Sequence, residues 1–553
     1  MRFPKRTQVC ATGVVVLLSS TWAPVTAQPV ARSAALPVLN WYGLSGTSTW
    51  AQTLDSAMVT DTISGGILNM TDAGLVKYLP NGSVGPSLAS AWRVSKDRKV
   101  YTFTIRSNAR FANGDPVTAE AAAWSLTRSL SKATNSPTSL QNLSHIVGAT
   151  RWNTGKAKSL QGVKALNRHQ VQIRLDKPIA FFLGALATSN GYVLDPRVVG
   201  NQSSQTYLTT TCAAHQGAGP FTFKCRNKSS SNTSFHAPGT TPQITLVPNK
   251  YYYGPKPRFI VNMKAIANTD TNYRQFQANG IDVTALPTAD IARNRHTPGY
   301  LEYPTLQQWY LSPDPKLKPF DNVHCRLAVA YAINYDAITS QILHGSMTTL
   351  HGMVPKGVLG YYSGGPQYNP ARARAELSRC PSGIHGVKLA YMHTSTDWDN
   401  VYGNAIPSMF SAVGIDIKAN GLTFNDWLKA VTQAQSKTRT LLVQNGLTAF
   451  PDPWNYCTLL MHTGQPFNSG EYSNPRVDRL LDKADIALNP SQRAHLYIQA
   501  QRIAVGEAGV IPIGQSKGYN LIKPWVHGLV ASATFDEVIP RGNEWANVTV
   551  SKH

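Results

Sequence analysis

The sequence offers little that indicates catalysis. It has no H-E-x-x-H sequence and no Walker lysine motif, and its 14 histidines are dispersed. A G-x-S-x-G sequence occurs at 514–518, but we expect no nucleophile elbow there. Hydrolysis by a Ser/His/Asp set that meets only in the folded protein stays open, but no motif supports it. Neither a C-x-x-C pair nor a His-rich spacing indicates zinc. We therefore expect no catalytic residue, no metal and no cofactor.

The cysteines are the other reactive side chains. Cys10 lies in a leader that we expect to be removed, which leaves five cysteines. An odd number in an oxidising compartment leaves at least one free thiol. Cys212 and Cys225 flank the turn sequence Gly-Ala-Gly-Pro at 217–220, so we predict that they form a disulfide, with two free buried thiols as the alternative. The sequence does not assign the state of Cys325, Cys380 and Cys457.

The N-terminus has the parts of a secretory signal peptide. Basic residues at the start precede an apolar run over 9–18, which is too short to span a bilayer because a spanning helix needs about 20 residues. Small residues ending at Ala27 form a cleavage site. Cys10 precedes the apolar run instead of following the cleavage site, so we expect no lipoprotein anchor. The pattern predicts a signal peptide over 1–27 and a soluble, periplasmic or secreted protein.

The formal net charge of +23 is unusual for a protein of 553 residues. Nucleic-acid binding would require basic clusters interleaved with aromatic residues, whereas Lys and Arg are scattered singly along the chain. We therefore expect no nucleic-acid partner. An anionic solute, an anionic membrane surface and an acidic habitat each fit the charge, and the sequence does not choose among them.

The elements that could position functional residues are clearest between Gly85 and Arg128. Residues 95–99 form a turn, and the residues after them alternate apolar and polar side chains up to position 106, which predicts a half-buried strand. The sequence Asn-Gly-Asp-Pro at 113–116 predicts a second turn. Thr118 then occupies the N-cap position of a helix from Ala119 to Leu130. Further along the chain, helices are expected at 323–333, 476–488 and 492–504.

The order of these elements resembles the signature of the extracellular solute-binding proteins of family 5, the oligopeptide- and dipeptide-binding receptors of ABC importers. The shared pattern is P-x-L-A-x-x-W from Pro86, a V-S-x-D turn, a Y-T-F strand and F-x-x-G-x-P-V-T-A from Phe111. Arg98 replaces the usual Gly after the turn, and Ala121 replaces the usual Asp in the helix. Further segments resemble the family in the same order, so that the resemblance covers essentially the whole mature chain: 217–221, 251–254, 276–282, 321–333 and 368–373.

The resemblance implies an α/β chain with a two-lobed, periplasmic-binding-protein-like fold of class II, an extra small subdomain and a central ligand cleft. We expect residues 28–72, 212–297 and 512–553 to form lobe I. Residues 73–211 would form the small subdomain II, and residues 298–511 would form lobe III. Contiguous, bead-like domains would contradict this organisation.

The resemblance also implies a function. A receptor of this kind captures a peptide, or another small peptide-like solute, between its lobes and delivers it to the membrane permease of an ABC importer. We expect a monomer without enzymatic activity. The alternatives are a periplasmic sensor or chaperone-like binder that uses the same cleft and, with less support, a secreted hydrolase.

The family's peptide anchors are altered in this chain. The resemblance places Ala449 where an Asp holds the ligand's amino group, and a charge-assisted contact of that kind is strong. His393 lies nearest to the position of an Arg that holds the ligand's carboxylate. Asp452 could replace the amine anchor, but Asp before Pro is also a common turn device, which we prefer. We therefore predict weak binding of free peptides through their termini. The alternative is an ordinary peptide receptor whose amine anchor is Asp452 or another acid.

The aromatic residues near the expected cleft are open to two interpretations, because a cleft wall and a packed core both use such side chains. The predicted ligand-binding residues are Tyr42, His393, Trp398, Asn445, Gly446, Thr448, Ala449, Asp452 and Trp454.

Overall fold

The computed structural model divides into an N-terminal segment, Met1–Leu36, and one compact unit, Pro37–His553, which contains every helix and strand described below. The residues that the structure describes are 35–43, 53–60, 62–79, 81–200, 216–224, 243–266, 268–393, 400–423, 426–427, 429–430, 440–445, 450–530 and 545–551. Among these, no helix has the length and apolar character that a membrane crossing requires.

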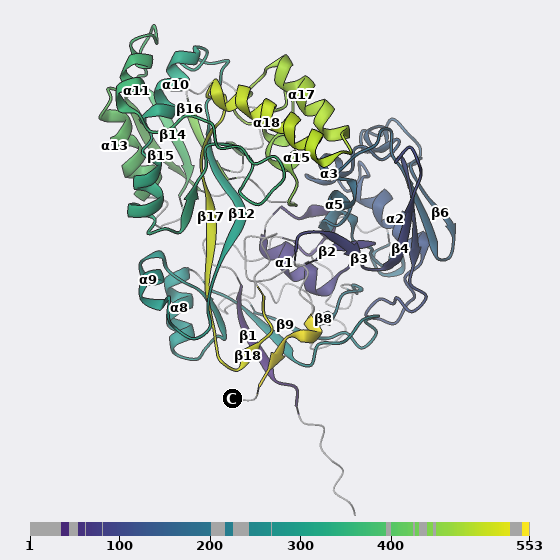
Figure 1. Cartoon of the computed structure of the whole chain (residues 1–553). Helices are drawn as coiled ribbons and strands as arrows, with labels where there is room; N and C mark the ends of the chain where they lie inside the picture. Colours follow the sequence, from purple (N-terminus) through teal and green to yellow (C-terminus); the bar gives the residue numbers. More distant parts are fainter. Residues whose placement is uncertain are drawn as a thin grey trace, which may run out of the picture. The chain divides into compact units, whose positions relative to one another are not determined.

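One mixed sheet of 11 strands runs through the compact unit (Figure 1). Its strands lie in the order β15 (Ile417–Leu422), β14 (Val387–Met392), β16 (Thr440–Asn445), β12 (Tyr300–Ser312), β17 (Ile511–Ile522), β11 (Val283–Ala285), β1 (Val38–Gly43), β10 (Ile260–Ala265), β9 (Gln243–Pro248) and β8 (Phe221–Phe223), and β13 (Met347–Thr349) also pairs with β17. Parallel pairs such as β1 with β10 and β14 with β15 lie on either side of the long antiparallel pair β12 and β17.

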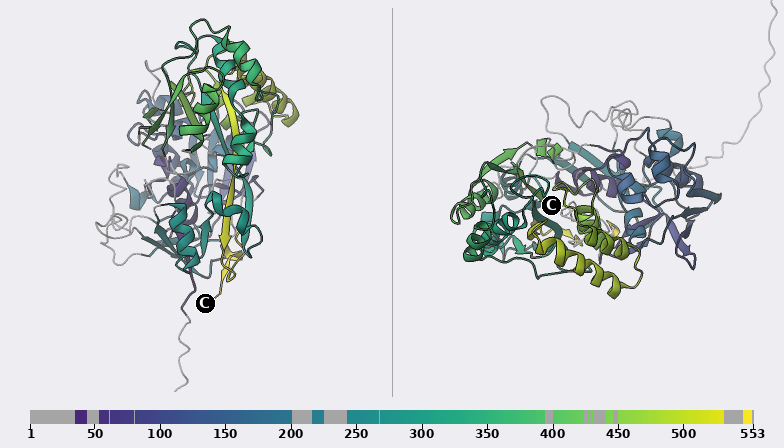
Figure 2. Two further views of the ribbon diagram at one scale, coloured as in Figure 1. Left: turned by 90° about the vertical axis from the view of Figure 1, so that its left-hand side faces the viewer. Right: turned by 90° about the horizontal axis from the view of Figure 1, so that it is seen from above.

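Strands β12 and β17 are the two longest strands, and both are seen side by side in Figures 1 and 2. At one end Leu521 of β17 pairs with both Tyr300 of β12 and Thr284 of β11. At the other end Leu311 of β12 pairs with both Ile511 of β17 and Val443 of β16. These two strands therefore connect the two halves of the sheet.

A second, four-stranded sheet has the order β4 (Ala89–Val94), β5 (Val100–Ile105), β7 (Gln170–Arg174) and β6 (Val163–Asn167). Helix α2 (Ala119–Ser129) packs against β6 and β7. Its N-cap is Thr118, whose hydroxyl accepts from the Ala121 amide at 3.2 Å, as predicted. Arg98, where the family has Gly, adopts the left-handed region at φ 56° in the turn before β5. The predicted half-buried strand and capped helix are both confirmed.

The second half of the chain supplies the longer helices. Asn322 caps α10 (Val323–Ala332). The two helices predicted at 476–488 and 492–504 are α17 (Pro475–Ile486) and α18 (Pro490–Gly506), which pack on each other. A disulfide between Cys325 of α10 and Cys380 joins residues separated by 55 positions. Cys457 is a buried free thiol. The predicted partners Cys212 and Cys225 lie outside the described residues, so that pairing stays a prediction.

Shorter elements complete the unit: η1 (Ser56–Met58), α1 (Thr62–Thr71), β2 (Val76–Tyr78), β3 (Val84–Pro86), α3 (Ser139–Leu143), α4 (Ala149–Asn153), α5 (Phe182–Leu186), η2 (Ser189–Gly191), α6 (Pro196–Val199), α8 (Thr269–Gln277), η5 (Thr288–Asp290), α9 (Ile291–Asn294), η6 (Ala337–Ile342), α11 (Pro370–Leu377), η7 (Val401–Ala405), α13 (Ile406–Ser411), α15 (Pro453–Tyr456), α16 (Thr458–Met461), β18 (Val526–His527), η8 (Trp545–Asn547) and β19 (Thr549–Val550).

Apolar side chains gather in three large clusters. The first combines residues of 39–70, 221–303 and 519–550, so segments far apart in the sequence share one core. The second surrounds β14 and β15 and the helices α10 and α13. The third combines residues of 73–193 with residues of 450–510. This clustering shows a discontinuous chain path, while the boundaries 28–72, 73–211, 212–297, 298–511 and 512–553 stay predictions.

Candidate ligand-binding site

The segment with the most predicted ligand-binding residues connects β16 to α15. The last residue of β16, Asn445, pairs with Trp309 of β12, so the segment begins beside one of the two connecting strands. Gly446, Thr448 and Ala449 lie outside the described residues. The chain is described again from Phe450, which is buried. The segment is therefore held at both ends, by a sheet on one side and by α15 on the other.

Asp452 is the N-cap of α15 and is also paired with an arginine. One carboxylate oxygen accepts from the Trp454 amide at 2.9 Å, which is the turn role expected from the sequence. Both oxygens also accept from Arg493 of α18, at 2.7 Å and 2.6 Å, in a two-point ion pair. The carboxylate is thus already neutralised by a guanidinium, which makes it a poor counter-ion for a ligand's ammonium group.

Arg493 belongs to a buried polar network. The Asp485 carboxylate accepts from the Tyr497 hydroxyl at 2.5 Å and from the Thr458 hydroxyl at 2.9 Å. Arg493 in turn donates to the Tyr497 hydroxyl at 3.3 Å. Burial opposes the charge of Arg493, but attraction by Asp452 outweighs it and raises the Arg493 pKa. Burial raises the pKa of Asp485 to about 6, against the hydrogen bonds from Tyr497 and Thr458, which lower it.

Trp454 packs inside a stack of three aromatic rings. Its ring centroid lies 4.6 Å from that of Phe181 and 5.7 Å from that of Phe450, with interplanar angles of 25° and 8°. Phe181 precedes α5, so the stack joins α15 to the part of the chain that contains the small sheet. Trp454 is only 5% exposed. These contacts are those of a packed core residue; a ligand contact for Trp454 stays a prediction.

The centre of β12 is irregular, and side chains compensate for the interrupted pairing. Its register with β17 shifts between Pro304 and Gln308. The Leu306 carbonyl accepts from the Tyr456 hydroxyl at 2.9 Å, and the Thr305 carbonyl accepts from Gln515 Nε2 at 2.7 Å. α15 is therefore fixed to the connecting strand at the point where that strand departs from regular pairing.

The remaining predicted residues are not brought together by the described part of the chain. Tyr42 of β1 is 1% exposed, and its hydroxyl accepts from Asn520 Nδ2 at 3.3 Å within the first core cluster. His393 follows β14 and is exposed, and its amide donates to the Leu422 carbonyl at 2.9 Å. Trp398 lies outside the described residues. Ligand contacts by Tyr42, His393, Trp398 and Asn445 stay predictions.

A metal centre finds no support where the chain is described, because no group of three or more His, Cys, Asp or Glu residues there could hold an ion. The network around Arg493 was missed by the sequence-based reasoning. The only signal was the helical pattern that placed Arg493 and Tyr497 four residues apart on one face of α18.

Comparisons with known proteins agree with this architecture. Residues 83–468 match the family model of the bacterial extracellular solute-binding proteins, family 5. A probable D,D-dipeptide-binding periplasmic protein of Escherichia coli is 28% identical and covers 88% of this chain and 91% of its own length. An oligopeptide-binding protein of Bacillus subtilis is 25% identical over 83% of this chain and 85% of its own.

Solved structures confirm the fold class. The murein tripeptide-binding protein of Escherichia coli superposes with a TM-score of 0.78 at 22% identity, covering 94% of this chain and 99% of that one. A structure of that protein described as an unliganded open form gives a TM-score of 0.69. An oligopeptide-binding protein of Haemophilus influenzae in complex with the peptide RPPGFSPFR gives 0.76 at 19% identity, covering 94% and 99%. The two-lobed α/β fold predicted from the sequence is therefore correct.

Proposed function

Because the chain belongs to the bacterial extracellular solute-binding proteins of family 5, we propose that it captures a peptide or peptide-like solute for an ABC importer. The observation that carries this proposal is the 28% identity, over 88% of the chain, to a protein named for dipeptide binding. The ligand would be held between the lobes that β12 and β17 connect, and closure would present it to the membrane permease.

The segment from Asn445 to α15 supports a site in this region. Its two ends are fixed, one by pairing of Asn445 with Trp309 and the other by the ion pair between Asp452 and Arg493. A binding segment held on rigid elements keeps its geometry at a low entropic cost. We propose that Gly446, Thr448 and Ala449 offer backbone groups to the ligand. His393 and Trp398 would contact it from the segment after β14.

The same proposal assigns the protein no reaction of its own. The receptor would act as a monomer outside the cytoplasm, without a cofactor, and its only output would be the ligand-bound, closed form. A purified preparation would then hydrolyse neither peptides nor esters. A hydrolysis rate that one Ser or His substitution abolishes would contradict this part of the proposal.

Native mass spectrometry of freshly purified mature protein tests the proposed ligand class. Closed receptors retain ligand through purification when dissociation is slow. We expect a mass excess that disappears on denaturation and that fragments as a peptide. A retained ligand without peptide bonds would contradict the peptide class and leave the receptor role intact. Normal uptake of every solute by a deletion strain, with lost signalling, would contradict the importer role and favour a sensor.

A further inference from the structure

The part of the chain that contains the four-stranded sheet, residues 73–200, carries more than half of the protein's excess positive charge. Residues 73–200 contain 17 Lys and Arg but only five Asp and Glu, against a net charge of +23 for the whole chain. Four of the five acidic residues are engaged locally. Asp115 and Asp195 lie in ion-pair distance of Arg197, Asp176 contacts His145, and Asp97 accepts from the Ser95 hydroxyl in its own turn.

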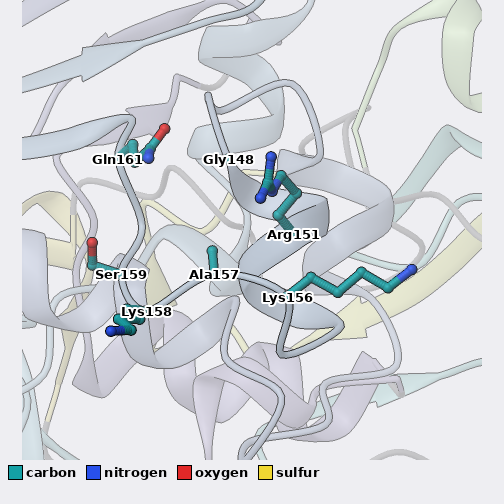
Figure 3. A pocket seen from close by; sticks show the side chains of 7 residues that line it. All are labelled: Gly148, Arg151, Lys156, Ala157, Lys158, Ser159 and Gln161. Atoms are coloured by element: carbon teal, nitrogen blue, oxygen red, sulfur yellow. The ribbon is translucent and has the colours of Figure 1, made fainter.

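A pocket of about 360 Å³ lies in the connection from α4 to β6. It is lined by Gly148, Arg151, Lys156, Ala157, Lys158, Ser159 and Gln161. Figure 3 shows the Arg151 side chain folded back beside Gly148, whereas the Lys156 side chain extends away from it. Arg151, Lys156 and Lys158 make no ion pair within the described chain. Three cations therefore border one hollow without a counter-charge from the described residues.

The backbone around the pocket is fixed by contacts on both sides. The Trp152 indole donates to the Thr127 carbonyl at 2.8 Å, which holds α4 against α2. The Lys156 amide donates to the Arg151 carbonyl at 2.7 Å and closes the turn after α4. Gly162 packs so closely that a Cβ there would lie 2.6 Å from the Val147 amide nitrogen. The cations therefore project from a rigid frame, and only their side chains have to be ordered by a ligand.

A fourth cation lies beside this frame. The Lys132 side chain packs over Gly155, with its Nζ 3.6 Å from the place of a Gly155 Cβ. Gly155 adopts φ +76°, a left-handed conformation that a residue with a side chain would strain. The turn can therefore keep Lys132 close to the pocket without a side chain intervening.

We propose that this pocket binds a phosphate group. The Arg151 guanidinium offers a planar fork that matches two phosphate oxygens, and the Lys ammonium groups act as mobile point charges. The Ser159 hydroxyl and the Gln161 amide add neutral donors at the same rim. A free phosphate, a phosphate ester and a phospholipid headgroup present the same oxyanion. The site is independent of the proposed peptide site, because no lining residue belongs to that site.

Titration calorimetry on the full mature protein at low ionic strength tests the pocket with inorganic phosphate and glycerol phosphate. We expect saturable binding by the unsubstituted protein. It should weaken at least about tenfold in the double variant Arg151→Gln/Lys158→Gln, because each lost contact to a charged group contributes about a factor of ten or more. The matched control, Arg93→Gln/Arg168→Gln, removes the same charge from exposed positions outside the pocket and should bind like the unsubstituted protein.

Vesicle sedimentation separates the sources of the phosphate. Phosphatidylglycerol vesicles should retain the unsubstituted protein and the control but not the pocket variant if the natural ligand is a lipid headgroup, and phosphatidylcholine vesicles should retain none. Binding of soluble phosphate without vesicle retention would identify a soluble ligand. Equal loss of binding in the control and the pocket variant would overturn the proposal, because it would show a diffuse charge effect. Absence of binding to both phosphates and to both kinds of vesicle would overturn it as well.

Discussion

Arg493 determines what Asp452 can do. The sequence presents Asp452 as an acid before a proline and leaves a turn role and a ligand role open. The structure shows that the Asp452 carboxylate caps α15 and accepts two hydrogen bonds from the Arg493 guanidinium. The Arg493 side chain is 7% exposed. The partner lies 41 residues away in the chain. No local pattern predicts such a pair, because it depends on how α18 packs against α15.

Removal of Arg493 should therefore be costly. Arg493→Gln would leave Asp452 largely buried without its counter-charge, and breaking a buried pair from one side costs about 3–5 kcal/mol. Urea unfolding should show this loss of the free energy of unfolding. Arg502→Gln, an exposed position on the same helix, should change it by no more than about 0.5 kcal/mol. Equal stability of the two variants would show that the ion pair does not support the fold.

Asp485 should make stability depend on pH. Burial raises its pKa from an ordinary value of 3.8 to about 6, so between these values the folded state holds a proton that the unfolded state has released. Stability contributed by this group is complete below pH 4 and is lost as pH rises through 6. The total change is about 3 kcal/mol for a shift of about two pKa units.

The variant Asp485→Asn isolates this effect, because Asn keeps an acceptor for Tyr497 and Thr458 and does not titrate. We expect the difference in unfolding free energy between the variant and the unsubstituted protein to shift in favour of the variant between pH 4 and pH 7. A difference that is constant over this range would show that Asp485 titrates normally in the folded protein.

At the scale of elements, patterns within one strand or one helical turn predicted secondary structure, whereas contacts between distant segments could not be predicted from them. Alternation predicted β5, and Thr118 was identified as an N-cap because capping depends on residues within one turn. The aromatic interpretation of Trp454 could not be decided, because its neighbour Phe181 comes from another part of the chain. The disulfide between Cys325 and Cys380 was not assigned, since its partners are separated by 55 positions.

That disulfide should be a large contributor to stability. Closing a loop of this length removes chain entropy from the unfolded state and stabilises the fold by about 4 kcal/mol in the chain-entropy model. The double variant Cys325→Ala/Cys380→Ala should lose this amount in urea unfolding under oxidising conditions. Each single variant should lose at least as much. A double variant as stable as the parent would show that the bond does not constrain the unfolded chain.

At the scale of the whole molecule, strands β12 and β17 connect the two lobes. Both strands continue from one half of the sheet into the other, and their pairing is irregular midway, near Leu306. Tyr456 and Gln515 satisfy the carbonyls there, and Tyr456 belongs to α15, which follows the predicted ligand-binding segment. Contacts at that segment are thereby mechanically linked to the strands about which a two-lobed receptor closes.

The same arrangement leads to a prediction about the ligand's termini. Ala449 stands where the family resemblance places an amine-binding Asp, and Asp452 is neutralised by Arg493. Neither position offers a free carboxylate to a ligand's ammonium group, and a protein with a net charge of +23 disfavours a cationic ligand further. Binding should therefore rest on the ligand's backbone and side chains. N-acetylation should change peptide affinity by less than about threefold, whereas the loss of a charge-assisted anchor would weaken binding about tenfold or more.

Calorimetry with matched free and N-acetylated di- to pentapeptides, on protein stripped of retained ligand, measures this ratio. Micromolar binding that disappears on acetylation would refute the prediction, and its loss in a folded Asp452→Asn variant would identify Asp452 as the amine anchor.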